Sequence, residues 1–119
     1  MSEASPIVVR SDPRGTLVAA ELDGVPFAAR RVFTVTGVPG GAVRGDHATP
    51  CQEFIVLVAG SVTVEVGVDG SGIELGEPIT LDRPGASLHL AAGRFVRYRL
   101  ADETSTILVF AESPYEDVT

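Results

Sequence analysis

The sequence lacks lysine and tryptophan, and it has a single cysteine, Cys51, among its 119 residues. One cysteine cannot form an intrachain disulfide, which excludes both a disulfide-stapled secreted scaffold and a thiolate metal cluster and favours a reducing cytoplasm. No apolar run approaches the roughly 20 residues that a membrane helix needs. Residues 1–6 also lack a basic region followed by an apolar run. We therefore expect a cytoplasmic protein with no membrane partner.

Basic residues are few and all are arginine. Nine arginines stand against 16 acidic residues, which gives a formal net charge of -7. Such a charge repels a phosphate backbone at long range, so we do not expect nucleic acid as a partner. A small phosphorylated ligand stays compatible with this charge, because arginines gathered in a pocket outweigh a distant acidic surface.

Glycine and proline recur between short runs of β-branched, aliphatic and aromatic residues. Thirteen glycines and eight prolines supply this punctuation, which is typical of an all-β domain. Val62, Val64 and Val66 alternate with polar residues, the period of a strand. Further strands are expected at 16–21, 29–36, 54–58, 73–75, 78–81, 87–90, 95–100 and 105–111. We predict one all-β domain over 1–119, with an arm or first strand at 1–10 and a tail at 113–119.

Several short segments, taken in order, carry a resemblance to a known family. They are Asp12-Pro13-Arg14-Gly15, Arg31-Val32-Phe33, Gly37-Val38-Pro39-Gly40, Arg44-Gly45-Asp46-His47-Ala48 and Leu81-Asp82-Arg83-Pro84. Their order and spacing resemble the cupin superfamily and, within it, the thymidine-diphosphate-sugar 3,4-ketoisomerases. The resemblance implies a jelly-roll barrel of the RmlC-like cupin type, a homodimer, and a metal-free site with no cofactor. It also implies a reaction that moves a ketone from carbon 4 to carbon 3 of a nucleotide-linked 6-deoxyhexose.

Such a reaction needs a group that takes a proton from one carbon and returns it to the next, through an enediol. Neutral imidazole suits this task at neutral pH. In the family it comes from an Arg-Gly-x-His-Ala-His signature, and this chain has threonine in place of the second histidine. The resemblance implies that His47 is the acid/base, and we expect Thr49 or His89 to assist it. His89 either points into the barrel or lies on the surface.

Four further residues are candidates for substrate binding. Arg44 and Arg14 match family positions, and a guanidinium suits the diphosphate or the developing enediolate oxygen. Ordinary surface charge is an equal explanation for Arg14. Phe33 stands where the family has tyrosine, and Glu53 precedes a buried-looking run, where it is either a base or an edge residue.

The metal-binding cupin pattern is only partly matched. Gly41, His47, Thr49, Glu53 and Gly60 fall at its spacings. Thr49 stands where that pattern has a histidine ligand, and Val96 stands at the histidine of the second motif. We predict no metal.

Two alternatives to a sugar-nucleotide ketoisomerase stay open. One is a metal-free cupin repurposed for another isomerisation or cyclisation in natural-product biosynthesis, favoured by the apolar Phe33, Phe95 and Val96 where the family has polar residues. The other is a non-catalytic binding protein. Affinity for thymidine diphosphate separates the family reaction from the repurposed one.

Overall fold

The computed structural model describes residues 6–68 and 74–114, and its regular elements are strands apart from one short 3-10 turn. The strands are β1 (Ile7–Asp12), β2 (Gly15–Ala20), β3 (Arg31–Val35), β4 (Val43–Ala48), β5 (Glu53–Ala59), β6 (Val62–Val66), β7 (Ile79–Leu81), β8 (Ser87–Leu90), β9 (Phe95–Leu100) and β10 (Thr106–Ala111), with the turn η1 (Leu22–Gly24) after β2. Within the described residues, no helix is long and apolar enough to cross a membrane.

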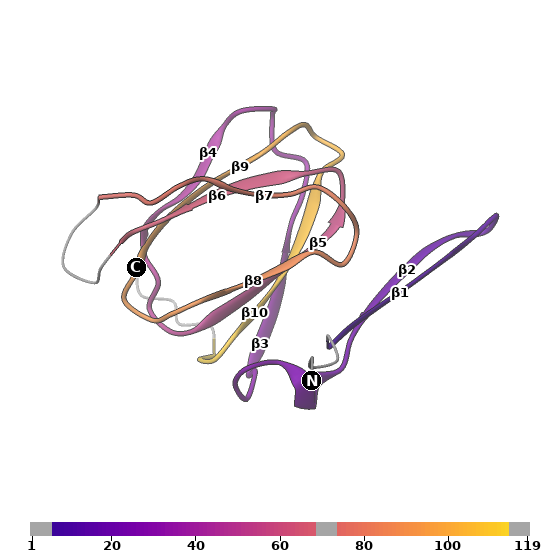
Figure 1. Ribbon diagram of the computed structural model, residues 1–119, viewed down its shortest axis with the longest axis horizontal. Helices are drawn as coiled ribbons and strands as arrows, with labels where there is room; N and C mark the ends of the chain where they lie inside the picture. The colour runs from indigo at the N-terminus through magenta and orange to yellow at the C-terminus, as the bar shows by residue number, and fades with distance from the viewer. Residues whose placement is uncertain (1–5, 69–73, 115–119) are drawn as a thin grey trace.

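Two antiparallel four-stranded sheets face each other across the interior (Figure 1). Their strand orders are β3-β10-β5-β8 and β4-β9-β6-β7. Side chains from both sheets fill the space between them, because successive residues of a strand point to opposite faces. Fully buried members of this core include Leu57 on β5, Val64 on β6, Leu100 on β9 and Ile107 on β10.

Strand β5 is buried on both faces, as its continuous apolar run predicts. Ile55 and Leu57 face the interior, whereas Phe54 and Val56 join a second apolar cluster on the outer face. Val25 belongs to the same outer cluster. The segment after η1 therefore covers this face of the sheet.

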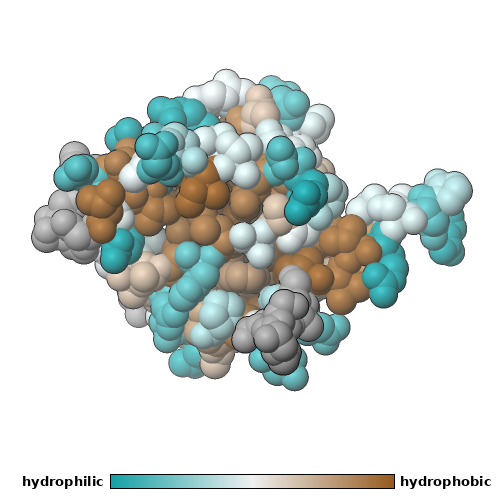
Figure 2. All heavy atoms as spheres, viewed as in Figure 1, coloured by the Kyte–Doolittle hydropathy of each residue, from teal (hydrophilic) through white to brown (hydrophobic). Residues whose placement is uncertain are grey.

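β1 and β2 form a hairpin that leaves the barrel (Figure 1). Near the barrel, Ile7, Val18 and Ala20 pack against the outer apolar cluster. Farther out, Leu17 is 57% exposed, and Figure 2 shows the apolar base of this arm giving way to a hydrophilic tip.

Most strands of the structure lie close to the positions predicted from the sequence, and β4 is the main exception. β8 and β9 begin and end where predicted, and the arm expected at the N-terminus contains most of β1, which continues to Asp12. β4 was not expected, because its Gly45 resembles turn chemistry. Of the strand expected at 73–75, residue 73 lies outside the described residues, and the described part forms only an isolated bridge between Leu75 and Gly67. The tail expected at 113–119 lies mostly outside the described residues, which end at residue 114.

Candidate active site

A cavity of about 470 Å³ lies between the two sheets. Six strands contribute to its wall. The lining residues are Phe33, Val43, Arg44, Gly45, His47, Glu53, Ile55, Leu90, Val96, Tyr98 and Val109. The polar side chains among them come from β4, β9 and the first residue of β5, and the remaining lining is apolar. The cavity thus combines apolar walls with a comparable share of polar surface from a few convergent side chains, an arrangement that suits a small polar ligand.

A bulge in β4 brings two of the polar side chains to one side. Arg44 lies opposite Tyr98 on β9, and His47 lies opposite Val96, with a register shift between them. Opposite residues of paired strands share a face, and Val96 and Tyr98 share one because they are two positions apart. The extra residue, Asp46, therefore lets Arg44 and His47 face the same cavity although they are three positions apart.

The backbone of the bulge suits its residues. Gly45 and Asp46 have φ angles of 79° and 62°, a region in which glycine and aspartate are favoured. A Cβ on Gly45 would lie 3.1 Å from the Val96 carbonyl oxygen and 3.3 Å from Cε1 of Tyr98. Oδ1 of Asp46 accepts a hydrogen bond from Nε of Arg97 at 2.9 Å, and Nη2 of the same guanidinium lies 2.8 Å from that oxygen. This ion pair ties the bulge to the neighbouring strand.

Two weak acids in the cavity have altered proton affinity. Burial raises the pKa of Glu53, and the nearby charges of Arg31 and His47 partly oppose that rise. Burial also raises the pKa of Tyr98, against the lowering effect of a hydrogen bond and positive charge from Arg44. The cavity therefore holds groups that keep protons more readily than in water, next to cationic side chains that stabilise their ionised forms.

Four of the predicted site residues meet at this cavity. Arg44, His47, Glu53 and Phe33 all line it, from β4, β5 and β3. The Arg31 guanidinium lies over the Phe33 ring, 5.1 Å from its centroid. Their grouping places an imidazole, a guanidinium and a carboxyl around one small-molecule space.

Thr49 does not line the cavity. The residue is 2% exposed, and its Oγ1 donates a hydrogen bond to the Ala91 carbonyl at 2.7 Å and accepts one from the Arg94 amide at 3.2 Å. Its own backbone is bonded to the same turn between β8 and β9. The hydroxyl thus holds two segments together, in place of the assisting role in proton transfer that we expected for it.

His89 points away from the cavity. Its neighbour Leu90 lines the cavity, so alternation along β8 turns the imidazole outward. There its Nε2 lies 2.8 Å from Oε1 of Gln52, and its ring lies 6.1 Å from that of Phe27. Of the two positions expected for His89, the structure shows the outer one.

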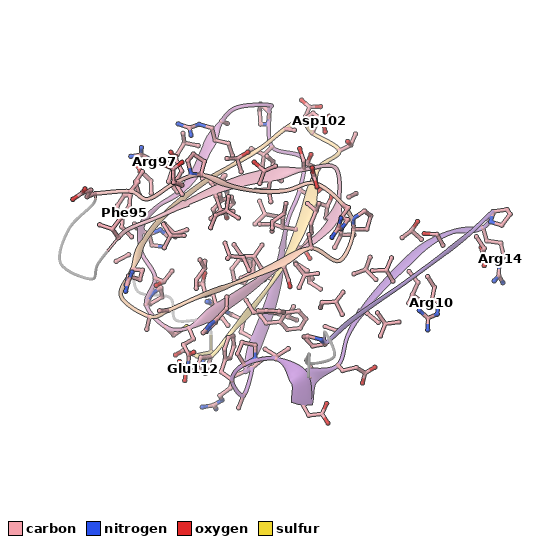
Figure 3. The ribbon with its side chains drawn as sticks, viewed as in Figure 1. Arg10, Arg14, Phe95, Arg97, Asp102 and Glu112 are labelled. Atoms are coloured by element: carbon pink, nitrogen blue, oxygen red, sulfur yellow. The ribbon has the colours of Figure 1, made fainter. Side chains whose placement is uncertain are left out.

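Arg14 lies near the tip of the β1–β2 hairpin, far from the cavity (Figure 3). Its Nη2 is 2.6 Å from Oδ2 of Asp12, and its side chain is 90% exposed. Within one chain Arg14 does not reach the cavity. Its ion pair with Asp12 at the hairpin tip is an exposed surface contact.

Two residues of β9 differ from expectation. Phe95, expected in the lining, is on the outer face beneath Arg97, whose guanidinium carbon is 5.9 Å from the ring centroid. Tyr98 lines the cavity and was not predicted. Its signal was present in the sequence, because Val96, Tyr98 and Leu100 alternate with arginines and form the inward face of the strand.

Potential metal ligands are sparse around the cavity. Among residues 6–68 and 74–114, no three His, Cys, Asp or Glu side chains lie together as a metal ion would require. Of the residues at the metal-cupin spacing, His47 and Glu53 line the cavity, whereas Thr49 is bonded elsewhere.

Comparison with known proteins gives one family and several similar structures. Residues 2–118 match the model of the family FdtA, described as WxcM-like, C-terminal. No curated protein gives a significant match. The TDP-quinovose 3,4-ketoisomerase WlaRB from Campylobacter jejuni is 25% identical over 95% of this chain and 85% of its own, with a TM-score of 0.76.

Two further structures are similar at lower identity. QdtA, a sugar 3,4-ketoisomerase from Thermoanaerobacterium thermosaccharolyticum in complex with TDP, is 23% identical over 95% of this chain and 81% of its own, with a TM-score of 0.77. The RmlC epimerase from Mycobacterium tuberculosis is 18% identical over 94% of this chain and 63% of its own, with a TM-score of 0.66. These likenesses confirm the predicted all-β, RmlC-like cupin barrel.

Proposed function

This chain belongs to the FdtA family, described as WxcM-like, C-terminal, and we propose that it is an isomerase of nucleotide-linked sugars. Its proposed reaction moves a ketone between carbons 4 and 3 of a 6-deoxyhexose joined to thymidine diphosphate. One observation carries this proposal: the β4 bulge turns His47 and Arg44 into one cavity. The TDP bound to QdtA supports a nucleotide-linked substrate.

The proposed mechanism assigns a different task to each side chain. His47, as neutral imidazole, takes the proton from carbon 3 and delivers it to carbon 4. Arg44 stabilises the negative charge that develops on the sugar oxygen in the enediolate. The Glu53 carboxyl, whose pKa burial raises against the opposing charges of Arg31 and His47, lines the same cavity and offsets the positive charge that His47 gains during the reaction. Phe33 and Val96 line the cavity and supply apolar wall around the reacting carbons. None of these steps uses a metal or a cofactor.

We also propose that the chain works as a homodimer, as its resemblance to the family implies. The projecting hairpin supports this, because Leu17 on it is 57% exposed and apolar. The proposal places Arg14, which lies on the same hairpin and outside the lining of this chain's cavity, near the cavity of a second copy. Light scattering during gel filtration tests the proposal, which predicts twice the mass of 12.4 kDa. A single-chain mass at high concentration contradicts it.

Two measurements together test the proposed activity. Calorimetric titration with thymidine diphosphate measures nucleotide binding, and incubation with TDP-4-keto-6-deoxyglucose in heavy water measures proton transfer. We expect saturable binding, deuterium at carbon 3 of the recovered substrate, and the 3-keto product. Absence of exchange and of product at high enzyme concentration would remove the proposal.

The repurposed cupin is the second candidate, and the apolar lining by Phe33 and Val96 favours it. This candidate predicts that no binding of thymidine diphosphate is detected in the calorimetric titration. Binding of thymidine diphosphate with no exchange at the sugar instead favours the non-catalytic binding protein.

A further inference from the structure

An isomerisation of this kind moves two protons, and the mechanism above accounts for one. One proton passes between adjacent carbons, and the other passes between the oxygens attached to them. His47 can carry the first. No second imidazole is available for the other: threonine replaces the second histidine of the family signature and is bonded to the Ala91 carbonyl, and His89 faces outward. The oxygen-to-oxygen transfer therefore needs a different carrier.

Tyr98 is placed to be that carrier. It lies two residues from Val96 on β9, and Val96 is the cross-strand partner of His47, so the phenol and the imidazole are on the same wall. Its ring passes closely over Gly45, where a Cβ would lie 3.3 Å from Cε1. The bare glycine leaves space for the ring against the bulge. Tyr98 and His47 both line the cavity.

Arg44 accompanies the phenol. It is the cross-strand partner of Tyr98 and lines the same cavity. A guanidinium only donates hydrogen bonds, so against a phenol it favours the phenolate. A hydroxyl that must release a proton and recover it within one turnover gains from such a neighbour.

We propose, resting on the function proposed above, that Tyr98 is a catalytic residue that carries the proton between the two sugar oxygens. As His47 removes the proton from carbon 3, the C–H electron pair forms the C3–C4 double bond. The carbonyl π electrons move onto O4, which takes the Tyr98 proton. The phenolate, held by Arg44, then takes the proton from the O3 hydroxyl. The O3 electrons form the new carbonyl, and carbon 4 takes its proton from the His47 imidazolium.

The electrostatics of the phenol agree with this role. Burial raises the pKa of Tyr98, and the charge of Glu53 adds a smaller rise, so the proton that Tyr98 must donate is in place at neutral pH. Arg44 opposes that rise through a hydrogen bond and its charge, which moderates the cost of the phenolate. Activity should therefore fall at alkaline pH, as the phenol loses its proton before the substrate binds.

The test is Tyr98→Phe, which removes the hydroxyl and keeps the ring over Gly45. Thr63→Val is the matched control, because it removes a hydroxyl from β6, the strand next to β9, where Thr63 pairs with Thr80 on the exposed side. We expect Tyr98→Phe to lower product formation by about 100-fold or more, as loss of a general acid does, with the alkaline fall in rate abolished. Affinity for thymidine diphosphate should stay within about threefold of the wild type in both variants.

The possible outcomes separate this assignment from the proposed function. If the wild type forms product and Tyr98→Phe, folded by circular dichroism, does so within about threefold, the assignment to Tyr98 alone is overturned. If the wild type neither binds the nucleotide nor exchanges the proton, the proposed function is overturned and the assignment with it.

Discussion

β4 and β8 are edge strands of opposite sheets, and each carries one of the two histidines of the chain. They differ in where the imidazole points. His47 on β4 lines the cavity, whereas His89 on β8 faces outward and contacts Gln52. Position on a barrel wall therefore does not make a histidine part of the site. The alternation of side chains along the strand, together with any bulge that interrupts it, determines whether a histidine faces the cavity.

The cause of the difference is local. β8 pairs regularly with β5, so His89 is opposite the outward Phe54 and Leu90 is opposite Glu53 in the cavity. β4 contains one extra residue, Asp46, and this shifts His47 to the side that Arg44 occupies. A one-residue change in register thus exchanges the inner and outer faces of a strand.

The largest expected effect is a difference in proton exchange between variants of the two histidines. His47→Gln should lower deuterium exchange at carbon 3 by about 100-fold or more, because no other imidazole faces the substrate. His89→Gln keeps a partner for Gln52 and should leave exchange within about threefold of the wild type. Mass spectrometry of the recovered sugar nucleotide measures both. Equal losses in the two variants would contradict the different roles.

An intermediate effect concerns Thr49, which ties the end of β4 to the turn after β8. Thr49→Val keeps the shape and removes the hydroxyl bonded to the Ala91 carbonyl and the Arg94 amide. Losing these two part-buried hydrogen bonds should lower the free energy of unfolding by about 0.5–1.5 kcal/mol for each bond. Urea denaturation measures this loss. Exchange per folded molecule should be unchanged, and a stable variant that has lost exchange would restore a chemical role for Thr49.

The smallest effect concerns Glu53, the one carboxyl that lines the cavity among the described residues. Burial raises its folded pKa above the ordinary 4.5. The folded state therefore binds the proton more tightly, so this contribution to stability is complete below pH 4.5 and is lost as pH rises through the folded pKa. Glu53→Gln removes the titrating carboxyl, and with it the loss of stability that its ionisation causes as pH rises.

Thermal melts across pH check this sign. The Glu53→Gln variant should be more stable than the wild type at neutral pH, with the difference shrinking in acid. A difference that grows in acid would mean that Arg31 and His47 outweigh burial in setting the pKa of Glu53.

Much of the fold, and part of the site, could be predicted from the sequence. The period of two placed β6, β8 and β9, because their inward residues are apolar and their outward ones polar. β4 was missed because Gly45 and Asp46 have turn-type backbone angles inside a strand. The direction of His89 stayed open because apolar residues flank it on both sides, and packing against β5 decided it. Tyr98 was predictable from alternation alone.

The most direct test of the central claim uses nuclear magnetic resonance of the two imidazoles, labelled with 15N. With two histidines in the chain, His89→Gln assigns both sets of signals. Titration with thymidine diphosphate and then with the ketosugar nucleotide should shift the ring signals of His47 and leave those of His89 in place. Shifts confined to His89 would contradict the account, since they would place the ligand on the outer face of β8.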